Sequence, residues 1–489
     1  MSTLTLTANS SRWSIFAVCS AALMLPLSFS AGVIATPAIA LQPGGSPLAL
    51  SWITNAFLLS FGSLLMAAGS LADRYGRKRL FISGVSVFTL LSLLTGWVPS
   101  VVWLDVVRAL QGAAAAAALA GGGAALANAF DGSERARAFS LLGTSFGVGL
   151  AAGPVIAGML MAVAGWHSVF LCCALFGVLA LVIGIRTLPE SRNPDAQALD
   201  WAGIFSFSIM LTLFTWGMLE VADSGSSLLS TSLLTASLVT ALLFVWIERR
   251  SPHPMLDLSL FRYGRFVGVQ LLPVATCYCF VVLLVVLPLR FMGFYGYDAL
   301  TTGLLMLAIS LPMLIVPSVA VSLTRRFHPG SISCAGLLLA AAGIGLLSVV
   351  TPQSSLPVTL LAMVMIGSGS GLPWGLMDNL SVSVVPPQRA GMATGIFSTV
   401  RVAGEGVALA SVSTLFSQLL VNQLNTQGEA PESARQLASY HLSGPHLLPL
   451  AEQAFQQLLL VLMTITLLCA IAIWRCLLPK RASALPAKD

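Results

Sequence analysis

The chain has 489 residues, of which 57% are apolar and only 9% are charged. Soluble domains carry about 25% charged residues, so this composition excludes an ordinary soluble fold and predicts an all-α protein that crosses a membrane many times. The net charge of +6 does not indicate a nucleic-acid partner, because it arises from basic residues placed in loops. The eight cysteines lie in or beside apolar runs without the spacing of a zinc site. We therefore expect no metal and no cofactor.

Fourteen apolar runs are long enough for a membrane-spanning helix, which needs about 20 residues. A transmembrane β-barrel would show short alternating segments instead. If both termini are cytoplasmic, 20 of the 24 basic residues fall on the cytoplasmic side, and one helix more or fewer would reverse every later loop. The runs cover roughly residues 13–41, 49–72, 80–98, 101–127, 137–164, 168–188, 200–220, 228–248, 266–292, 300–323, 330–351, 356–385, 389–420 and 453–478.

A short charged turn separates the second run from the third. Residues 69–79 read Gly-Ser-Leu-Ala-Asp-Arg-Tyr-Gly-Arg-Lys-Arg, and so many charges predict a place at the cytoplasmic membrane surface. The turn resembles the G-x-x-x-D-R-x-G-R-[KR] sequence between the second and third helices of the major facilitator superfamily. This resemblance implies a cytoplasmic gating turn that consists of Gly69, Asp73, Arg74, Gly76, Arg77, Lys78 and Arg79.

The chain also repeats itself. Residues 70–84 align without gaps with residues 322–336, and the same offset of 252 places helices two to five over helices ten to thirteen. The repeat predicts two six-helix bundles, at about 13–190 and 262–478, that flank an inserted helix pair at 200–248. The fold expected is that of the major facilitator superfamily, with fourteen transmembrane helices.

The segments outside the helices differ in character. In the second copy of the charged turn, Arg325 replaces the acid and His328 replaces Gly76, so we expect only the first copy to act as a charged latch. The segments 187–200 and 249–265 have the composition of cytoplasmic linkers. Residues 422–452 are polar and are expected to form an extracytoplasmic loop between helices 13 and 14.

The fifth run carries glycines about one helical turn apart, which allows a neighbouring helix to come close. These are Gly149, Gly153 and Gly158, together with Pro154, which removes one helix hydrogen bond. Ordinary small-residue packing would also explain them. The pattern G-x-x-x-G-P-x-x-x-G nevertheless resembles the antiporter motif of proton-coupled drug exporters, and residues 166–170 resemble the W-R-W-x-F of the same families. With fourteen helices, the resemblance is to the fourteen-helix drug:proton antiporter branch.

Ionisable residues inside apolar runs are energetically costly and indicate functional positions. In the fourth run, Asp105-Val-Val-Arg108-Ala-Leu-Gln111-Gly112 contains the R-x-x-Q-G sequence of the same superfamily, whose arginine is associated with proton coupling. Asp105 is one helical turn from Arg108, close enough to pair with it. A coupling role and a fixed structural ion pair both remain open.

Two further acids lie deep in the C-terminal half. Asp378 has no obvious partner in its own helix and is the preferred titrating group. Glu405 follows Arg401 by four residues on the same helical face, so it either takes part in proton coupling or locks the helix through that pair. Exporters of this branch often carry an acid in helix one, but residues 28–37 have none. The proton-coupling role then falls to Asp105, Asp378 or Glu405.

These observations favour transport over other functions. No lysine follows a G-x-x-x-x-G loop, which excludes a nucleotide-driven pump, and the histidines form no catalytic cluster, so we do not expect an enzyme. We expect a monomeric proton-coupled antiporter of the bacterial cytoplasmic (inner) membrane that exports small amphiphilic organic compounds. Proton-coupled uptake is the alternative, since one fold serves both directions. Candidate cavity residues are the polar or aromatic side chains at membrane depth, Trp52, Asn55, Phe57, Gln111, Trp374 and Met377.

Overall fold

The computed structural model describes residues 8–477 except 41, 194–198, 253, 352–354, 386–388 and 427–446. Every regular element in this part of the chain is a helix. Fourteen helical spans within it are long and apolar enough to cross a membrane, which confirms the predicted number. Because the number of spans is even, the first span begins and the last span ends on the same face of the protein. That this face is cytoplasmic stays a prediction from the charge bias.

The first six spans form the N-terminal bundle, and the next two are the inserted pair. The N-terminal helices are α1 (Ala8–Ile39), α2 (Pro47–Tyr75), α3 (Arg77–Leu94) with the short helix η1 (Thr95–Trp97), α4 (Val101–Ala129), α5 (Gly132–Ala164) and α6 (Trp166–Thr187). The inserted helices are α7 (Trp201–Ser224) and α8 (Leu228–Arg250), followed by η2 (Leu258–Arg262).

The C-terminal bundle contains two interrupted spans. In the first, α9 (Gly264–Thr276) and α10 (Val282–Gly293) are joined by a π-helical turn, η3 (Cys277–Val281). The second breaks between α11 (Ala299–Ser310) and α12 (Pro312–Leu323), because a proline has no N–H to continue the helical ladder. The remaining spans are α13 (Pro329–Ser348), α14 (Leu356–Ser383), α15 (Ala390–Thr426) and α17 (Leu448–Leu477).

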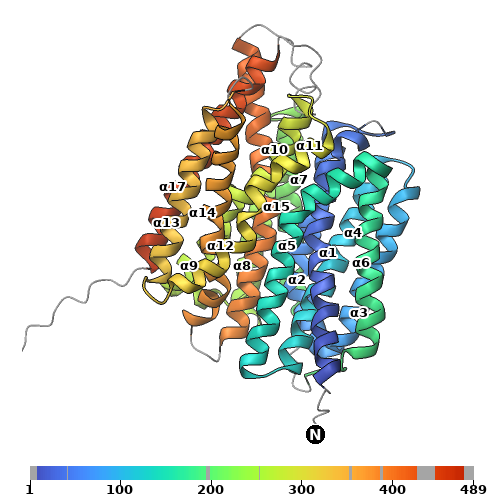
Figure 1. Ribbon diagram of the computed structural model, residues 1–489. Coiled ribbons are helices and arrows are strands. Elements are labelled where there is room, and N and C mark those ends of the chain that lie inside the picture. Colours follow the sequence, from blue (N-terminus) through green and yellow to red (C-terminus); the bar gives the residue numbers. More distant parts are fainter. Residues whose placement is uncertain are drawn as a thin grey trace, which may run out of the picture.

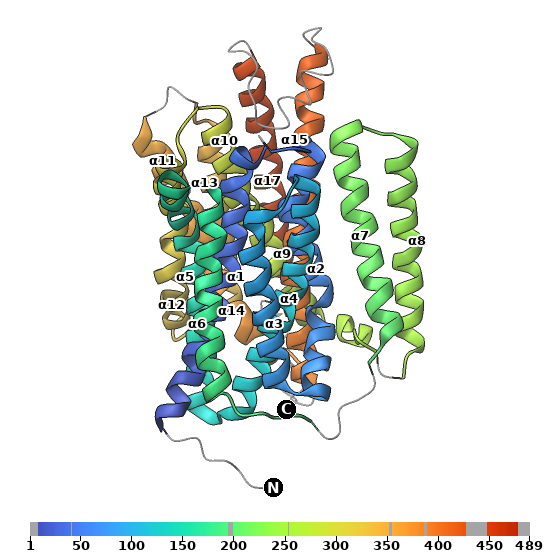
Figure 2. The ribbon, with the colours of Figure 1, turned by 90° about the vertical axis from the view of Figure 1, so that its right-hand side faces the viewer.

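The inserted pair lies behind the two bundles in Figure 1 and stands at their side in Figure 2. Its helix α7 packs against α2 of the N-terminal bundle and α15 of the C-terminal bundle. The hydroxyls of Thr414 and Ser417 on α15 donate hydrogen bonds of 2.6 and 2.5 Å to backbone carbonyls of α7. The inserted pair therefore touches both bundles along their junction.

The internal repeat reappears in the helix starts. The third helix begins at Arg77 and its counterpart α13 begins at Pro329, the positions that the predicted offset relates. The local chemistry differs, because Nδ1 of His328 accepts a hydrogen bond of 3.1 Å from the backbone N–H of Gly330. His328 thus caps its own helix, whereas Gly76 has no side chain with which to cap α3.

The expected outer loop at 422–452 is shorter than predicted. Helix α15 continues to Thr426, and α17 already includes residues from Leu448 onward. Glu452, which we had expected in this loop, lies inside α17 and is 6% exposed. The end of α15 and the start of α17 are polar, so the sequence pattern did not identify these residues as helical.

Candidate functional site

The N-terminal bundle buries one arginine among neutral oxygens. Arg108 of α4 is fully buried, and its Nε donates to the Ile53 carbonyl at 2.9 Å. Its Nη1 donates to Ser28 Oγ and to Gln111 Oε1, each at 2.9 Å. The guanidinium also lies 4.3 Å from the centre of the Phe57 ring. A second ring, Phe170, lies at 5.8 Å. Three hydrogen bonds and two aromatic rings thus compensate the buried charge.

Asp105 does not supply the counter-charge that its spacing suggested. Its Oδ1 is buried without a hydrogen-bond partner, and so is Nη2 of Arg108. The arginine side chain instead reaches the backbone of α2 and the Ser28 hydroxyl of α1. The expected i,i+3 pair is therefore not formed, because neighbouring helices provide the acceptors.

The C-terminal bundle holds a second arginine in an open setting. Nη1 of Arg401 on α15 lies 3.4 Å from Oδ1 of Asp378 on α14, with side-chain exposures of 15% and 65%. The expectation that Asp378 is deeply buried is therefore wrong: it lies only five residues before α14 ends at Ser383, near a surface. Its partner comes from a neighbouring helix.

Arg401 also contacts the opposite bundle. Its guanidinium lies 6.0 Å from the ring centre of Phe146, which belongs to α5. Glu405 is not its ion-pair partner within the described residues; the turn that carries it faces α9–η3, since a Cβ on Gly404 would lie 3.8 Å from Cys277 Sγ. Of the two alternatives for Glu405, the helix-locking pair is thus not formed.

The six candidate cavity residues have different surroundings. Asn55, Phe57, Gln111 and Met377 are buried, whereas the two tryptophans, Trp52 and Trp374, are partly exposed. Gln111 is held in place, since its Nε2 donates to Ser92 Oγ at 3.0 Å. The role of all six as cavity residues stays a prediction.

The glycines of the fifth helix lie at close helix contacts. A Cβ at Gly149 or Gly153 would lie 2.6 Å from the Leu23 carbonyl oxygen or 2.4 Å from Ser30 Oγ, both on α1. A Cβ on Gly158 would lie 2.4 Å from the Ala299 carbonyl oxygen, which belongs to α11 of the other bundle. The motif therefore packs α5 within its own bundle and, at its outer end, across the junction.

This junction is tighter on the outer side than on the inner side. Along α5, the approach lengthens from 2.4 Å at Gly158 to 4.0 Å at Gly147, measured from the added Cβ to the nearest atom of α11 or α12. Between α2 and α15 the same measure is 3.4 Å at Gly406 and 2.6 Å at Gly62, and it is longest, 3.8 Å, at Gly395 on the cytoplasmic side. Gly69, nearer still to the cytoplasmic turn, has nothing within 4 Å. The bundles separate toward the face that carries the termini.

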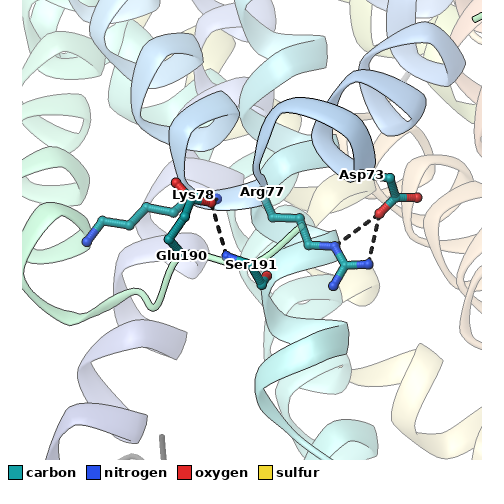
Figure 3. Close-up of polar contacts among 5 residues, drawn as sticks. All are labelled: Asp73, Arg77, Lys78, Glu190 and Ser191. Atoms are coloured by element: carbon teal, nitrogen blue, oxygen red, sulfur yellow. Dashed lines mark hydrogen bonds and ion pairs between the residues drawn. The ribbon is translucent and has the colours of Figure 1, made fainter. Parts of the chain in front are cut away.

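The charged turn between α2 and α3 is held by an internal ion pair (Figure 3). Arg77 Nη2 lies 2.9 Å from Asp73 Oδ1, one helical turn away. Gly76 joins the two helices with φ +120°, a conformation that side chains with a Cβ rarely adopt. Arg74 lies over its neighbour, the Tyr75 ring, at 5.7 Å. The glycine is therefore required by the turn geometry itself.

The segment after α6 forms hydrogen bonds to this turn. The sequence did not indicate this contact. Glu190 Oε1 accepts from the backbone N–H of Lys78 at 3.3 Å, and the Ser191 carbonyl accepts from Arg77 N at 2.9 Å (Figure 3). Glu190 Oε2 also lies 3.6 Å from Arg79 Nε. Glu190 thus supplies the N-terminal cap that Gly76 lacks. Sequence spacing gave no signal, because 112 residues separate Lys78 from Glu190.

A buried ion pair in the C-terminal bundle was also missed. Arg290 of α10 and Glu452 of α17 form a two-pronged pair with side-chain exposures of 1% and 8%. Arg290 also donates to the Val350 carbonyl at 3.2 Å and lies over the Phe455 ring at 4.2 Å. Both partners belong to one bundle, so the pair fixes α10 against α17 and does not cross the junction.

Beside this ion pair lies a small cavity of about 60 Å³. Tyr295 contributes to its lining, and burial raises the pKa of this tyrosine above its usual range. Near it, Asp298 caps α11, and hydrogen bonds from Thr301 hold the pKa of its carboxyl below the usual value. Neither group therefore changes charge near neutral pH. We interpret the residues around this cavity as structural and not as proton-binding.

The comparisons with known proteins agree with this architecture. The sequence matches the Major Facilitator Superfamily over residues 16–409. It is 31% identical to the multidrug resistance protein Stp of Mycobacterium tuberculosis over 76% of this chain and 69% of that protein. It is 30% identical to the puromycin resistance protein pur8 of Streptomyces alboniger over 86% and 84%, and 28% identical to the multidrug efflux pump LfrA of Mycolicibacterium smegmatis over 81% and 79%.

Solved structures share the fold at low sequence identity. A bacterial homologue of the human lysosomal transporter Spinster superposes with a TM-score of 0.67 at 14% identity, covering 96% of this chain and 97% of that one. The xylose transporter XylE from E. coli gives a TM-score of 0.60 at 14% identity, with coverage of 96% and 97%. The chain belongs to the Major Facilitator Superfamily, as a fourteen-helix, multi-pass protein of the bacterial cytoplasmic membrane.

Proposed function

We propose that this protein exports small amphiphilic organic compounds in exchange for protons, by rocking its two bundles about a central site. The Arg401–Asp378 pair carries the proposal. It joins an accessible acid to an arginine that also contacts the opposite bundle at Phe146. The names of the relatives, two resistance proteins and an efflux pump, support export over uptake.

The coupling step follows from the chemistry of this pair. A carboxylate beside a guanidinium is an acceptor for either that cation or a proton. When a proton binds Asp378, Arg401 loses its counter-ion and becomes free to interact elsewhere, for example at the Phe146 face. When a substrate or the arginine requires the negative charge, the proton leaves. Asp378 is 65% exposed and lies five residues before the end of α14, so in this proposal it exchanges protons with water at that face.

The remaining motifs would set which face is open. Gly158 allows α5 to contact α11 at the outer end, which supports a closed outer face in this conformation. Arg77 pairs within its own bundle, with Asp73 and the Ser191 carbonyl, on the face where the bundles separate. Asp105 and Glu405, both partly shielded acids without an ion pair to the nearby arginine, are the next candidates for proton binding.

One proton per cycle is energetically sufficient. A membrane potential of about 100 mV supplies ~2.3 kcal/mol per charge, and one pH unit adds ~1.4 kcal/mol. For an uncharged substrate, their sum supports a concentration gradient of a few hundredfold, at ~1.4 kcal/mol per decade. Exchange of one proton for a monovalent cation moves no net charge, so it draws on the pH difference alone. We further expect a monomer that carries no catalytic activity and has no nucleic-acid partner; its partners are the substrate, protons and lipid.

Proton movement in inverted membrane vesicles with an acidified interior tests the proposal. Ethidium, a lipophilic cation, and a set of anionic antibiotics would be added while a pH-sensitive dye reports the interior. Wild type should release protons with at least one compound, and Asp378→Asn should not. Asp131→Asn is the matched control, because Asp131 is 97% exposed and lies outside the spans.

Two results would overturn the proposal in different ways. Proton-coupled uptake of these compounds into right-side-out vesicles, without release in inverted ones, would reverse the direction and favour a symporter. Release that persists in Asp378→Asn but disappears in Glu405→Gln or Asp105→Asn would keep the exporter and reassign the acid.

A further inference from the structure

The inserted helix pair carries two carboxyl groups at its cytoplasmic end, where α7 begins and α8 ends. Asp200 caps α7, since its Oδ1 accepts from the Gly203 N–H at 2.9 Å. Glu248 lies in the last turn of α8, is only 4% exposed, and its Oε2 accepts from the Leu256 N–H at 3.0 Å. One oxygen of each carboxyl group is thus bound to the backbone.

The two other oxygens share one small buried space. Asp200 Oδ2 and Glu248 Oε1 are both buried, and neither has a hydrogen-bond partner. Both lie beside Gly203: a Cβ built on this glycine would be 2.9 Å from the Asp200 oxygen and 2.6 Å from the Glu248 oxygen. A side chain at position 203 would fill the space between the carboxyl groups, so glycine keeps it open.

The arginines nearby are either exposed or already in contact with another side chain. On α8, Arg249 is exposed and the Arg250 guanidinium lies over the Trp246 ring at 4.4 Å. In the following linker, Asp257 pairs with Arg389 at 3.3 Å. No ion pair to Asp200 or Glu248 is formed in the described part of the chain.

The chain next to the two carboxyl groups is apolar. Leu199 precedes Asp200, and Leu256 donates its N–H to Glu248; both leucines belong to one buried hydrophobic cluster, which also includes Ile204, Phe244, Met255, Ala67, Ala393 and Ile396. Such surroundings strongly disfavour two negative charges side by side. In the described part of the chain the pair has no cation to offset its charge, and its two free oxygens are buried, which disfavours double ionisation.

We propose that Asp200 and Glu248 bind one proton between them, as a carboxyl–carboxylate pair that is separate from the transport acids. The protonated oxygen of one group donates a hydrogen bond to the free oxygen of the other, so one proton satisfies both unpartnered atoms and removes one charge. The inference goes beyond the proposed transport function and does not depend on it.

Because of where the pair lies, its proton affects how the inserted helices are attached to the two bundles. Glu248 holds the Leu256 N–H, and the next residue, Asp257, pairs with Arg389 at the start of α15. On the other side, the chain before Asp200 contributes Glu190 and Ser191 to the turn between α2 and α3. The pair lies between the links to the two bundles, so loss of its proton would set two charges against each other and loosen the inserted pair.

Infrared spectroscopy of the purified full-length protein tests the proposal without any substrate. Between pH 6 and 9, wild type should show the band of a protonated carboxyl group that persists at neutral pH and shifts in deuterated water. This band should be lost in Glu248→Gln and in Asp200→Asn, and it should remain in Asp131→Asn. A band unchanged in both pair variants would overturn the proposal.

Thermal unfolding over the same pH range gives a second, independent readout. If the folded state holds a proton that the unfolded chain releases, wild-type stability falls as pH rises through the range in which the pair loses it. Glu248→Gln should flatten this decline, which a variant that simply packs less well would not do. The titration would be repeated with added NaCl, MgCl₂ or CaCl₂. Release of the proton by Mg²⁺ or Ca²⁺ at micromolar concentration would make this a cation site and reject the proton pair.

Discussion

The surroundings of the two candidate coupling arginines differ between the two bundles. Arg108 in the N-terminal bundle is fully buried and donates three hydrogen bonds to neutral oxygens. Arg401 in the C-terminal bundle is 15% exposed and pairs with a carboxylate, Asp378, whose side chain is 65% exposed. The first charge is stabilised by oriented dipoles, and the second by a carboxylate on a neighbouring helix.

This difference suggests a division of labour. Dipoles do not titrate, so the surroundings of Arg108 stay the same when the proton concentration changes. The pair at Arg401 exchanges partners at low cost, because exposed ion pairs contribute little to stability. A transporter needs both properties: a fixed element that shapes the site and an element that responds to protons. The predictions below test this contrast.

The limiting case of a fixed charge is Arg290, which is buried with Glu452. We expect Glu452→Ala to lower the free energy of unfolding by about 3–5 kcal/mol, because it leaves a buried guanidinium without its partner. Thermal unfolding in detergent would measure the loss. The double variant Arg290→Met with Glu452→Leu should recover most of it, and a double variant as unstable as the single one would contradict a purely structural role.

Arg108 should tolerate no change in shape. Arg108→Lys keeps the charge, but one ammonium group cannot reach acceptors on α1, α2 and α4 together, and each hydrogen bond to a charged group contributes about 1.5–3 kcal/mol. We expect ethidium efflux from energised cells to fall by at least about tenfold, the equivalent of ~1.4 kcal/mol. Arg401→Lys, as the matched control, should retain most efflux. Equal losses in both variants would remove the contrast between the bundles.

Removal of the contacts between Glu190 and the charged turn should have a moderate effect on stability. Glu190→Ala removes the cap from α3 and should cost about 1 kcal/mol; the exposed contact to Arg79 adds little. Gly76→Ala should cost about 1–3 kcal/mol, because its φ of +120° is strained for alanine. Its Cβ would also meet Glu190 Oε1 at 2.6 Å. Thermal unfolding of the single variants would measure both.

The double variant Gly76→Ala with Glu190→Ala separates the two causes. It relieves the contact with Glu190 but not the backbone strain, so its loss should be smaller than the sum of the single losses. Strict additivity would mean that Glu190 does not press on this glycine.

The sequence predicted what depends on composition and local spacing. Apolar length gave fourteen spans, and the repeat offset matched the starts of α3 and α13 at Arg77 and Pro329. Prediction from sequence failed where the hydrogen-bond or ion-pair partner of a residue belongs to another helix. Arg108 takes its acceptors from α1 and α2 and so leaves Asp105 unpaired, although their spacing placed both on one face.

For the same reason, local sequence patterns could not predict ion pairs between residues that are far apart in the chain. Arg290 and Glu452 are 162 residues apart, and the polar sequence around Glu452 resembled a loop. Asp378 was assigned to the interior because it follows an apolar run, whereas its exposure depends on how the bundles separate. The roles of the candidate cavity residues and of each acid stay predictions.

The smallest expected effect is the most informative one. Asp378→Asn should change the free energy of unfolding by less than about 1 kcal/mol, because the side chain is 65% exposed and its ion pair is solvent-screened. The same variant should abolish substrate-driven proton release. A functional loss without a stability loss separates a proton-binding role from a structural one. If thermal unfolding instead showed a loss as large as that of Glu452→Ala, Arg401 would be a fixed charge like Arg108, and the proton site would have to be sought at Glu405 or Asp105.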